Sequence, residues 1–202
     1  MDQTLIQSYT AHLKRRLSPH RFRHSLGVMS TMCDLAELYG LDRTRAAITG
    51  LVHDIAKELP KERLLALADD ASIPFGHPCE RLPIYLHGPV GAYLAKRELV
   101  IGDPIILEAI ASHTFYGSAP FDNHFQRCLW LADLTEPTRT FPGVDKLRAT
   151  LYEGRMEEAL LLHSGWVIDW FQRNRIPIHP QIETLFETLS ARLEPDQALL
   201  AR

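Results

Sequence analysis

The chain has 202 residues, of which 46% are hydrophobic and 23% are charged, so it can bury one substantial core and a single domain is the default expectation. The formal net charge is −3 at pH 7, and no stretch is basic enough to supply the positive surface that nucleic acids require. The composition therefore argues against a nucleic-acid partner and leaves small anionic ligands open.

The cysteines and the hydropathy of the sequence indicate in which cellular compartment the protein is expected. Cys33, Cys79 and Cys128 form no Cys-x-x-Cys pair and are odd in number, which argues against a disulfide framework and fits a reducing cytosol. Residues 1–7 lack the apolar core of a signal peptide, and no apolar run is long enough to span a bilayer. We expect a cytoplasmic protein without a membrane partner.

In chain order, the sequence predicts a series of helices joined by short turns, with no convincing strand. Ser18 and Pro19 are typical of an N-cap and a first helical position, and Gly40 is a typical stop, so one helix is expected from Pro19 to Tyr39. A shorter helix before it is predicted by apolar residues spaced four apart: Leu5, Tyr9, Leu13 and Leu17.

The helical stretch of residues 49–57 interrupts its apolar residues with His53 and Asp54, and Asp42 is a plausible N-cap for it. A buried, ionised carboxylate without a partner costs several kcal/mol, so Asp54 needs a cation nearby, and a metal ion is the most economical one. Gly50, one turn earlier, should leave space there. For an isolated His-Asp pair, a core histidine beside an exposed aspartate remains the ordinary interpretation.

Two further histidines precede and follow this pair. His24 shares an apolar stripe with Val28 in the second helix, so its imidazole should face inward. Gly88 and Pro89 mark the cap and the first turn of a helix, which places His87 just outside a helix N-terminus, where anions are favoured.

Two later helices add a fourth histidine and a second carboxylate. His113 follows Ile106 by seven residues and so lies on the apolar face, and Asp133 shares an apolar stripe with Leu129. Each such residue alone is more often structural. Five titratable side chains on inward or core-facing positions together favour a shared metal site.

Three of these segments, residues 21–28, 51–57 and 86–92, resemble the HD-domain metallohydrolases. Residues 111–114, residues 132–144 and the tripeptide Ile178-His179-Pro180 narrow the resemblance to the YqeK family and extend it over nearly the whole chain. The most specific signal is Glu-Pro-x-Arg-x-Phe-Pro-Gly, which ends at Gly143. Gly88 stands where many members have alanine, and the loop from Phe115 to Pro120 is less typical.

The series of helices predicts an all-α fold, a single domain over residues 1–202 built as a bundle of roughly eight or nine helices. The resemblance identifies it as an HD domain with a dinuclear metal site between its central helices. Residues 18–140 should carry the metal-ligand motifs, residues 141–193 should form closing helices, and residues 194–202 should fray.

The resemblance implies two metal ions. The first would be held by His24, His53, Asp54 and Asp133, and the second by His87, His113 and a bridging Asp54. Four imidazoles and two carboxylates suit iron, manganese or zinc better than magnesium, and the resemblance favours iron. Such a metal lowers the pKa of bound water and supplies hydroxide at neutral pH, so no serine or cysteine nucleophile is required.

The substrate contacts follow from charge. Lys57, one helical turn beyond His53, is a candidate to neutralise a polyphosphate and to act in catalysis together with Asp54. Arg139 and Arg21 are further candidates for substrate binding. Arg139 could instead hold its own loop, and Arg21 could pair with an acidic neighbour.

The resemblance implies hydrolysis of diadenosine tetraphosphate, and of related dinucleoside tetraphosphates, symmetrically into two nucleoside diphosphates. One alternative is a phosphohydrolase of nucleoside mono-, di- or triphosphates. Another is a nucleotide-sensing protein without turnover, although an incomplete ligand set would favour that function and the set here is complete. The partner is a small-molecule nucleotide in each case. The sequence leaves the oligomeric state open, including a homodimer.

Overall fold

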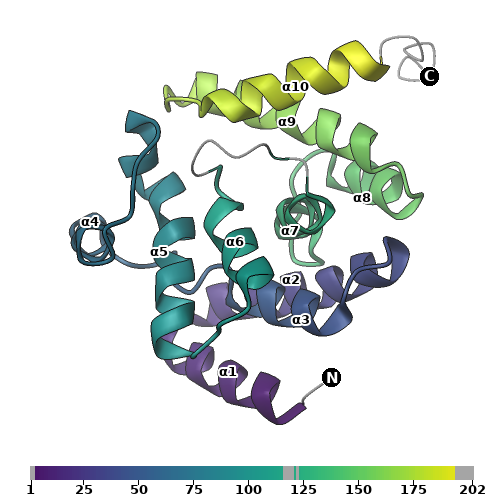
Figure 1. The fold of residues 1–202 in the computed structure, drawn as a ribbon. Coiled ribbons are helices and arrows are strands. Elements are labelled where there is room, and N and C mark those ends of the chain that lie inside the picture. The colour runs from purple at the N-terminus through teal and green to yellow at the C-terminus, as the bar shows by residue number, and fades with distance from the viewer. Residues whose placement is uncertain (1–2, 116–120, 122, 194–202) are drawn as a thin grey trace. The chain divides into compact units, whose positions relative to one another are not determined.

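The computed structural model describes residues 3–115, 121 and 123–193, which form ten α-helices, one short 3-10 helix and no strand (Figure 1). The all-α prediction is therefore confirmed. Ten α-helices exceed the eight or nine expected, because Gly143 and Gly154 adopt left-handed φ angles of 91° and 81° and separate a short helix, α8 (Val144–Tyr152), from its neighbours.

The chain divides into two compact units, residues 1–140 and 141–202. The first unit contains the predicted metal ligands, and the prediction of a single domain stays a prediction. The tail of residues 194–202, which the sequence suggested would fray, lies outside the described residues. Across the part of the chain that is described, no helix combines the length and the apolar character needed to cross a bilayer.

The first unit is organised around an apolar core in which Leu13, Leu51 and Leu86 are fully buried. Its helices pack in neighbouring pairs, and α2 contacts both α3 and α7. The elements of this unit are α1 (Gln3–Arg16), α2 (Pro19–Leu38), α3 (Arg43–Val52), α4 (Lys61–Asp70), the 3-10 helix η1 (Pro78–Arg81), α5 (Pro83–Glu98), α6 (Pro104–Ser112) and α7 (His124–Thr135).

Local hydrogen bonds start several of these helices where the sequence predicts. The Ser18 hydroxyl accepts a hydrogen bond from the Arg21 amide at 3.2 Å, and the Asp42 carboxylate accepts one from the Arg45 amide at 2.7 Å. A side-chain oxygen at this position satisfies one of the amide groups that a helix start leaves open. The predicted starts of α2 and α3 are therefore confirmed.

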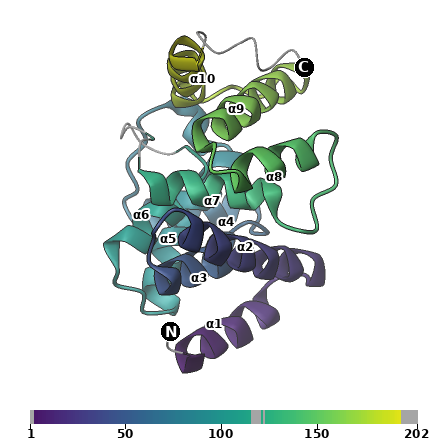
Figure 2. The ribbon, with the colours of Figure 1, turned by 90° about the vertical axis from the view of Figure 1, so that its right-hand side faces the viewer.

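Helices α2 and α3 lie side by side in both views (Figures 1 and 2), and Gly50 is the point of closest approach. A Cβ atom at Gly50 would stand 2.8 Å from the Met29 Cα and 2.8 Å from the Val28 carbonyl oxygen. The prediction that Gly50 leaves space for an ion is wrong, because α2 fills that space. The close approach instead brings His24 of α2 next to the end of α3.

Helix α3 ends at Val52, so His53 and Asp54 lie in the turn after it and not within a continuous helix to residue 57. The His53 ring forms a hydrogen bond with the Gly50 carbonyl. To continue the α-helix, the Asp54 amide would have to donate to that same carbonyl. The chain then forms a tighter turn, in which the Lys57 amide donates to the Asp54 carbonyl three residues back. The prediction of a helix through residues 49–57 is corrected accordingly.

The start of α5 also differs from the prediction. Helix α5 begins at Pro83, so His87 lies within its second turn and Pro89 inside the helix. Pro89 has no amide hydrogen for the Tyr85 carbonyl, but the Thr114 hydroxyl donates to that carbonyl at 2.6 Å. A hydroxyl from another part of the chain thus replaces the hydrogen bond that Pro89 cannot donate. Pro89 can therefore lie inside the helix, although the local sequence predicts it at a helix start.

The second unit contains α8, α9 (Met156–Arg173) and α10 (Pro180–Leu193), with α9 packed against both of the others. Gly143 caps α8, and a Cβ atom there would approach the Trp166 ring to 2.8 Å. The Phe141 ring meets Trp166 edge to face, with 5.9 Å between the ring centres. The Phe-Pro-Gly part of the sequence motif therefore serves packing within this unit.

Candidate metal centre

Three histidines of the first unit are oriented by backbone carbonyl groups. His53 and His113 each follow the last residue of a helix, where carbonyl groups lack an intrahelical partner. Since a carbonyl only accepts, each Nδ1 carries the hydrogen and each Nε2 keeps its lone pair. The Nδ1 to oxygen distances are 2.8 Å for His53 to Gly50, 2.9 Å for His87 to Pro83 and 2.6 Å for His113 to Ile110.

Asp54 lies at the centre of the histidines and presents each carboxylate oxygen to a different pair. Its Oδ2 is 3.6 Å from the His24 Nε2 and 3.5 Å from the His53 Nε2. Its Oδ1 is 3.4 Å from the His87 Nε2 and 3.7 Å from the His113 Nε2. All five side chains are buried, with exposed fractions of 3% or less. One carboxylate therefore connects two pairs of imidazoles.

The donor atoms form two triads suited to a divalent metal ion. His24, His53 and Asp54 make one, and Asp54, His87 and His113 make the other, with the ligand atoms of each triad within 4.8 Å of one another. The His24 Nε2, the His53 Nε2 and the Asp54 Oδ1 are buried atoms without a hydrogen-bond partner. Such atoms are costly to bury, and a cation in each triad would give all three a partner.

Asp133, the sixth predicted ligand, stands beside the first triad but belongs to neither. Its Oδ1 lies 3.1 Å from the His24 Nε2, and its side chain is 20% exposed. The expectation that this carboxylate faces the core is therefore only partly met. Asp133 lies where the buried centre meets solvent.

The three predicted cationic residues all contact this centre. Arg21 donates to the Asp54 Oδ2 at 2.7 Å, so it has the acidic neighbour that the sequence suggested. Arg139 donates to the Asp133 Oδ1 at 2.6 Å and to the Asp133 carbonyl at 2.8 Å. The Lys57 Nζ lies 3.0 Å from an imidazole nitrogen, the Nε2 of His87. Each cation therefore already has a partner in the ligand set.

The environment holds these groups in the protonation states that metal binding requires. Burial lowers the pKa of His53 to about 3, and burial together with Lys57 lowers the pKa of His87 to about 4, so both rings are neutral at pH 7. Burial by itself would raise the pKa of Asp54, but the neighbouring His53 and Lys57 hold it well below its usual value. The carboxylate is therefore ionised.

His24 differs from the other histidines. Burial alone would lower its pKa, but the adjacent carboxylates of Asp133 and Asp54 outweigh burial and raise it. Its Nδ1 lies 3.1 Å from the Oε1 of Glu136, a residue that sequence reasoning did not assign to the site. The signal was present, since Glu136 opens the most specific sequence motif, but only the fold shows that it reaches α2.

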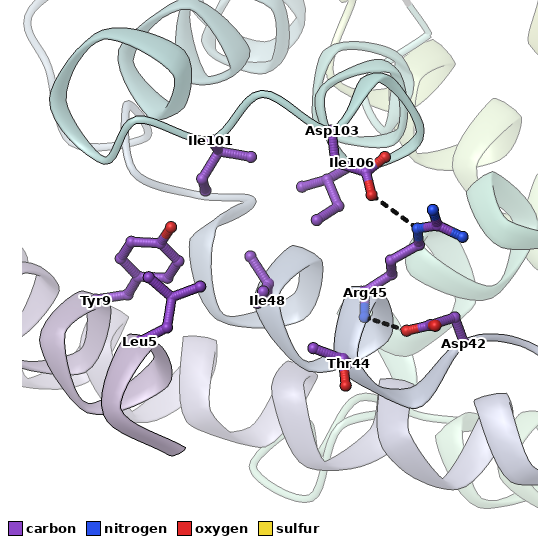
Figure 3. Close-up of a pocket in the computed structure, with 9 residues that line it drawn as sticks. All are labelled: Leu5, Tyr9, Asp42, Thr44, Arg45, Ile48, Ile101, Asp103 and Ile106. Atoms are coloured by element: carbon purple, nitrogen blue, oxygen red, sulfur yellow. Dashed lines mark hydrogen bonds and ion pairs between the residues drawn. The ribbon is translucent and has the colours of Figure 1, made fainter. Parts of the chain in front are cut away.

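A pocket of about 320 Å³ lies away from the centre, against α1, α3 and the start of α6 (Figure 3). Its walls include Leu5, Ile48 and Ile106. At its rim the Arg45 Nε donates to the Asp103 Oδ2 at 2.7 Å, so these charges are paired with each other. We assign the chemistry to the histidine and aspartate cluster and not to this pocket.

The HD domain family matches residues 21–165, a span that includes every histidine and aspartate of the centre. The chain belongs to the HD domain family. A solved structure of an HD domain protein from Clostridium acetobutylicum, described as a predicted hydrolase of this superfamily involved in NAD metabolism, is 34% identical. It superposes with a TM-score of 0.84, covering 92% of this chain and 97% of its own. The HD-domain fold expected from the sequence is thus confirmed.

Two relatives narrow the position of the chain within this family. A Bacillus subtilis protein is 36% identical over 84% of this chain and 89% of its own length, and a Halalkalibacterium halodurans protein is 32% identical over 88% and 92%. Both relatives are named symmetrical bis(5'-nucleosyl)-tetraphosphatase. The family recognised from the sequence motifs is therefore confirmed.

Proposed function

We propose that this protein hydrolyses dinucleoside tetraphosphates, diadenosine tetraphosphate in particular, symmetrically into two nucleoside diphosphates. The observation that carries the proposal is the pair of buried triads that share Asp54. The relatives named for this activity match the chain over most of its length. Their names do not assign roles to residues, so the roles of individual residues in this chain are also part of the proposal.

The proposed cofactor is a pair of transition-metal ions. His24, His53, Asp54 and Asp133 would hold one ion, and His87, His113 and the shared Asp54 would hold the other. The mixed nitrogen and oxygen donor set suits iron, manganese or zinc, and resemblance to the family favours iron. When bound, the ions supply Lewis-acid chemistry, which activates water and polarises a phosphoryl oxygen.

The protein's own residues bind and orient the polyphosphate. The imidazoles and Asp54 are buried, whereas the side chains of Arg21 and Arg139 are 18% and 32% exposed. A substrate entering from solvent would therefore first meet cationic side chains. Lys57, Arg21 and Arg139 are proposed to neutralise its phosphates, with the Lys57 ammonium placed closest to the imidazoles.

Symmetric cleavage follows from where the phosphates would be held. Water adds at one of the two inner phosphorus atoms in line with the central anhydride oxygen, and the bond from that phosphorus to that oxygen breaks. Each half then leaves as a nucleoside diphosphate, and one of the two carries the oxygen of the water. A charge that develops on the departing diphosphate is stabilised by the neighbouring cationic side chains.

The three buried cysteines are free thiols, which fits the cytoplasm as the proposed location. The partner of the site is the nucleotide substrate. A homodimer remains compatible with the sequence, and the proposed centre draws all of its ligands from one chain.

Chromatography of early products from diadenosine tetraphosphate tests the proposal. We expect ADP alone, two molecules per substrate, and in ¹⁸O-labelled water one labelled oxygen per two ADP molecules. Equal amounts of AMP and ATP at the first time points would refute symmetric cleavage. Turnover of free nucleoside mono-, di- or triphosphates without turnover of the tetraphosphate would favour the simpler phosphohydrolase, and metal binding without any turnover would favour a sensor.

A further inference from the structure

Glu136 is a fully buried carboxylate at the end of α7, with an exposed fraction of 0%. It is the C-cap residue of that helix, and its backbone turns to extended angles, φ −57° and ψ 153°. A buried carboxylate is stable only where hydrogen bonds or charges compensate the loss of water. The partners of Glu136 therefore indicate why the chain keeps a charge there.

Thr138 and His24 both donate to the Glu136 carboxylate. The Thr138 amide donates to Oε2 at 2.7 Å, and the Thr138 hydroxyl donates to Oε1. The Nδ1 of His24 lies 3.1 Å from the same Oε1. Because a carboxylate only accepts, the His24 Nδ1 must carry a hydrogen, so Nε2 is the nitrogen left to bind a metal. That is the nitrogen that faces Asp54 and Asp133.

Gly27 makes room for this carboxylate. It follows His24 by three residues on α2 and so lies on the same side of the helix. A Cβ atom at Gly27 would overlap the Glu136 Oε2 and would lie 3.2 Å from the Glu136 Cδ. Any side chain at residue 27 would therefore displace the carboxylate.

His24 is the one imidazole of the centre whose Nδ1 faces a side chain and not a backbone carbonyl. We infer that Glu136 is a positioning residue for His24, fixing its tautomer and ring orientation for metal binding, and that Gly27 is required to keep Glu136 in place. The inference rests on the metal centre of the proposed function. Such a carboxylate behind a histidine ligand typically changes metal affinity by about 10–100-fold.

A cobalt titration of chelator-treated protein, followed by the visible absorbance of bound Co²⁺, measures this effect. Glu136→Ala should weaken the affinity by about 10–100-fold, and Gly27→Ala should weaken it in the same direction. In a chain with both substitutions, the second should add little, because the displaced carboxylate is already gone. Gly91→Ala is the matched control, since its Cβ would meet only ordinary contacts of 3.4 Å or more, and its affinity should equal that of the wild type.

The double substitution tests whether Gly27 acts through Glu136. The inference requires that the Gly27→Ala effect on metal affinity vanish without Glu136, because no carboxylate is then left to displace. Nitrogen chemical shifts of the His24 ring give a second readout in the zinc-loaded protein, where the metal should bind Nε2. They should show hydrogen on Nδ1 in the wild type, and the loss of that preference in Glu136→Ala.

The outcomes separate the two proposals. Wild-type affinity in Glu136→Ala, or an undiminished Gly27→Ala effect in its absence, would overturn this inference alone. A wild-type protein that binds no cobalt and gains no metal under any loading condition would overturn the proposed metal centre and this inference with it.

Discussion

The Lys57 Nζ lies 3.0 Å from the His87 Nε2, the same nitrogen that faces the Oδ1 of Asp54. One lone pair cannot accept a hydrogen bond from lysine and bind a metal at the same time. Metal binding at His87 would therefore leave the Lys57 ammonium in need of another acceptor at the edge of the centre. A phosphate oxygen of the substrate would be such an acceptor.

This arrangement predicts that Lys57→Ala separates metal binding from catalysis. The metals should stay, because every proposed ligand remains, and kcat should fall by roughly 10²–10³-fold, as when one charge-stabilising donor is removed. Lys61→Ala, at an exposed residue at the start of α4, is the control and should be fully active. Elemental analysis and a product assay on the same preparations test this, and a fully active Lys57→Ala chain with metals bound would refute the role.

Asp54→Ala should remove both metals together. Asp54 belongs to both triads, so its loss takes a ligand from each and leaves adjacent cations without the shared negative charge. We expect metal content to fall from two ions per chain toward zero and turnover to fall to background. Elemental analysis of protein purified without chelator provides the reference. Normal activity in Asp54→Ala, or an active wild type that is consistently metal-free, would contradict the mechanism.

Gly88→Ala should destabilise the fold. A Cβ atom at Gly88 would overlap the Thr114 hydroxyl and stand 2.7 Å from the Ala111 carbonyl oxygen, so the contact between α5 and the end of α6 must open. Urea unfolding should show a loss of about 1–3 kcal/mol, as is typical of overpacking. Gly91→Ala in the same helix should keep or raise stability, and equal behaviour of the two variants would contradict the explanation.

The buried thiols predict a loss of stability in alkali. Burial raises the pKa of Cys128 to about 12, above its ordinary value of 9.0. Above pH 9 the unfolded chain therefore loses this proton while the folded chain keeps it. The thiol's contribution to the free energy of unfolding is complete below pH 9 and is lost as the pH rises toward 12. The slope from this thiol is at most about 1.4 kcal/mol per pH unit.

Urea unfolding of the wild type and of Cys128→Ala at pH 8 and pH 10 measures that contribution. The variant should lose less stability between the two pH values than the wild type does. In the folded wild type at pH 8, Cys128 should also resist thiol reagents until the chain unfolds. An identical pH dependence in both chains would show that this thiol does not titrate as its burial requires.

The sequence by itself determined the features that depend on near neighbours in the chain. Helix starts at Ser18 and Asp42 were predictable because a cap is a hydrogen bond to an amide three residues ahead. Inward positions of His24 and His113 were predictable because helical periodicity assigns a face to each residue. The family motifs added the proposed ligands and the proposed activity.

The tertiary structure decided what depends on contacts between distant segments. Pro89 predicted a helix start, but the Thr114 hydroxyl, 29 residues from the carbonyl it bonds, allows α5 to begin at Pro83. Glu136 reaches His24 across 112 residues. A local sequence pattern reflects only the hydrogen bonds that are available within one helical turn. It cannot indicate a donor or a carboxylate that comes close only when the helices pack.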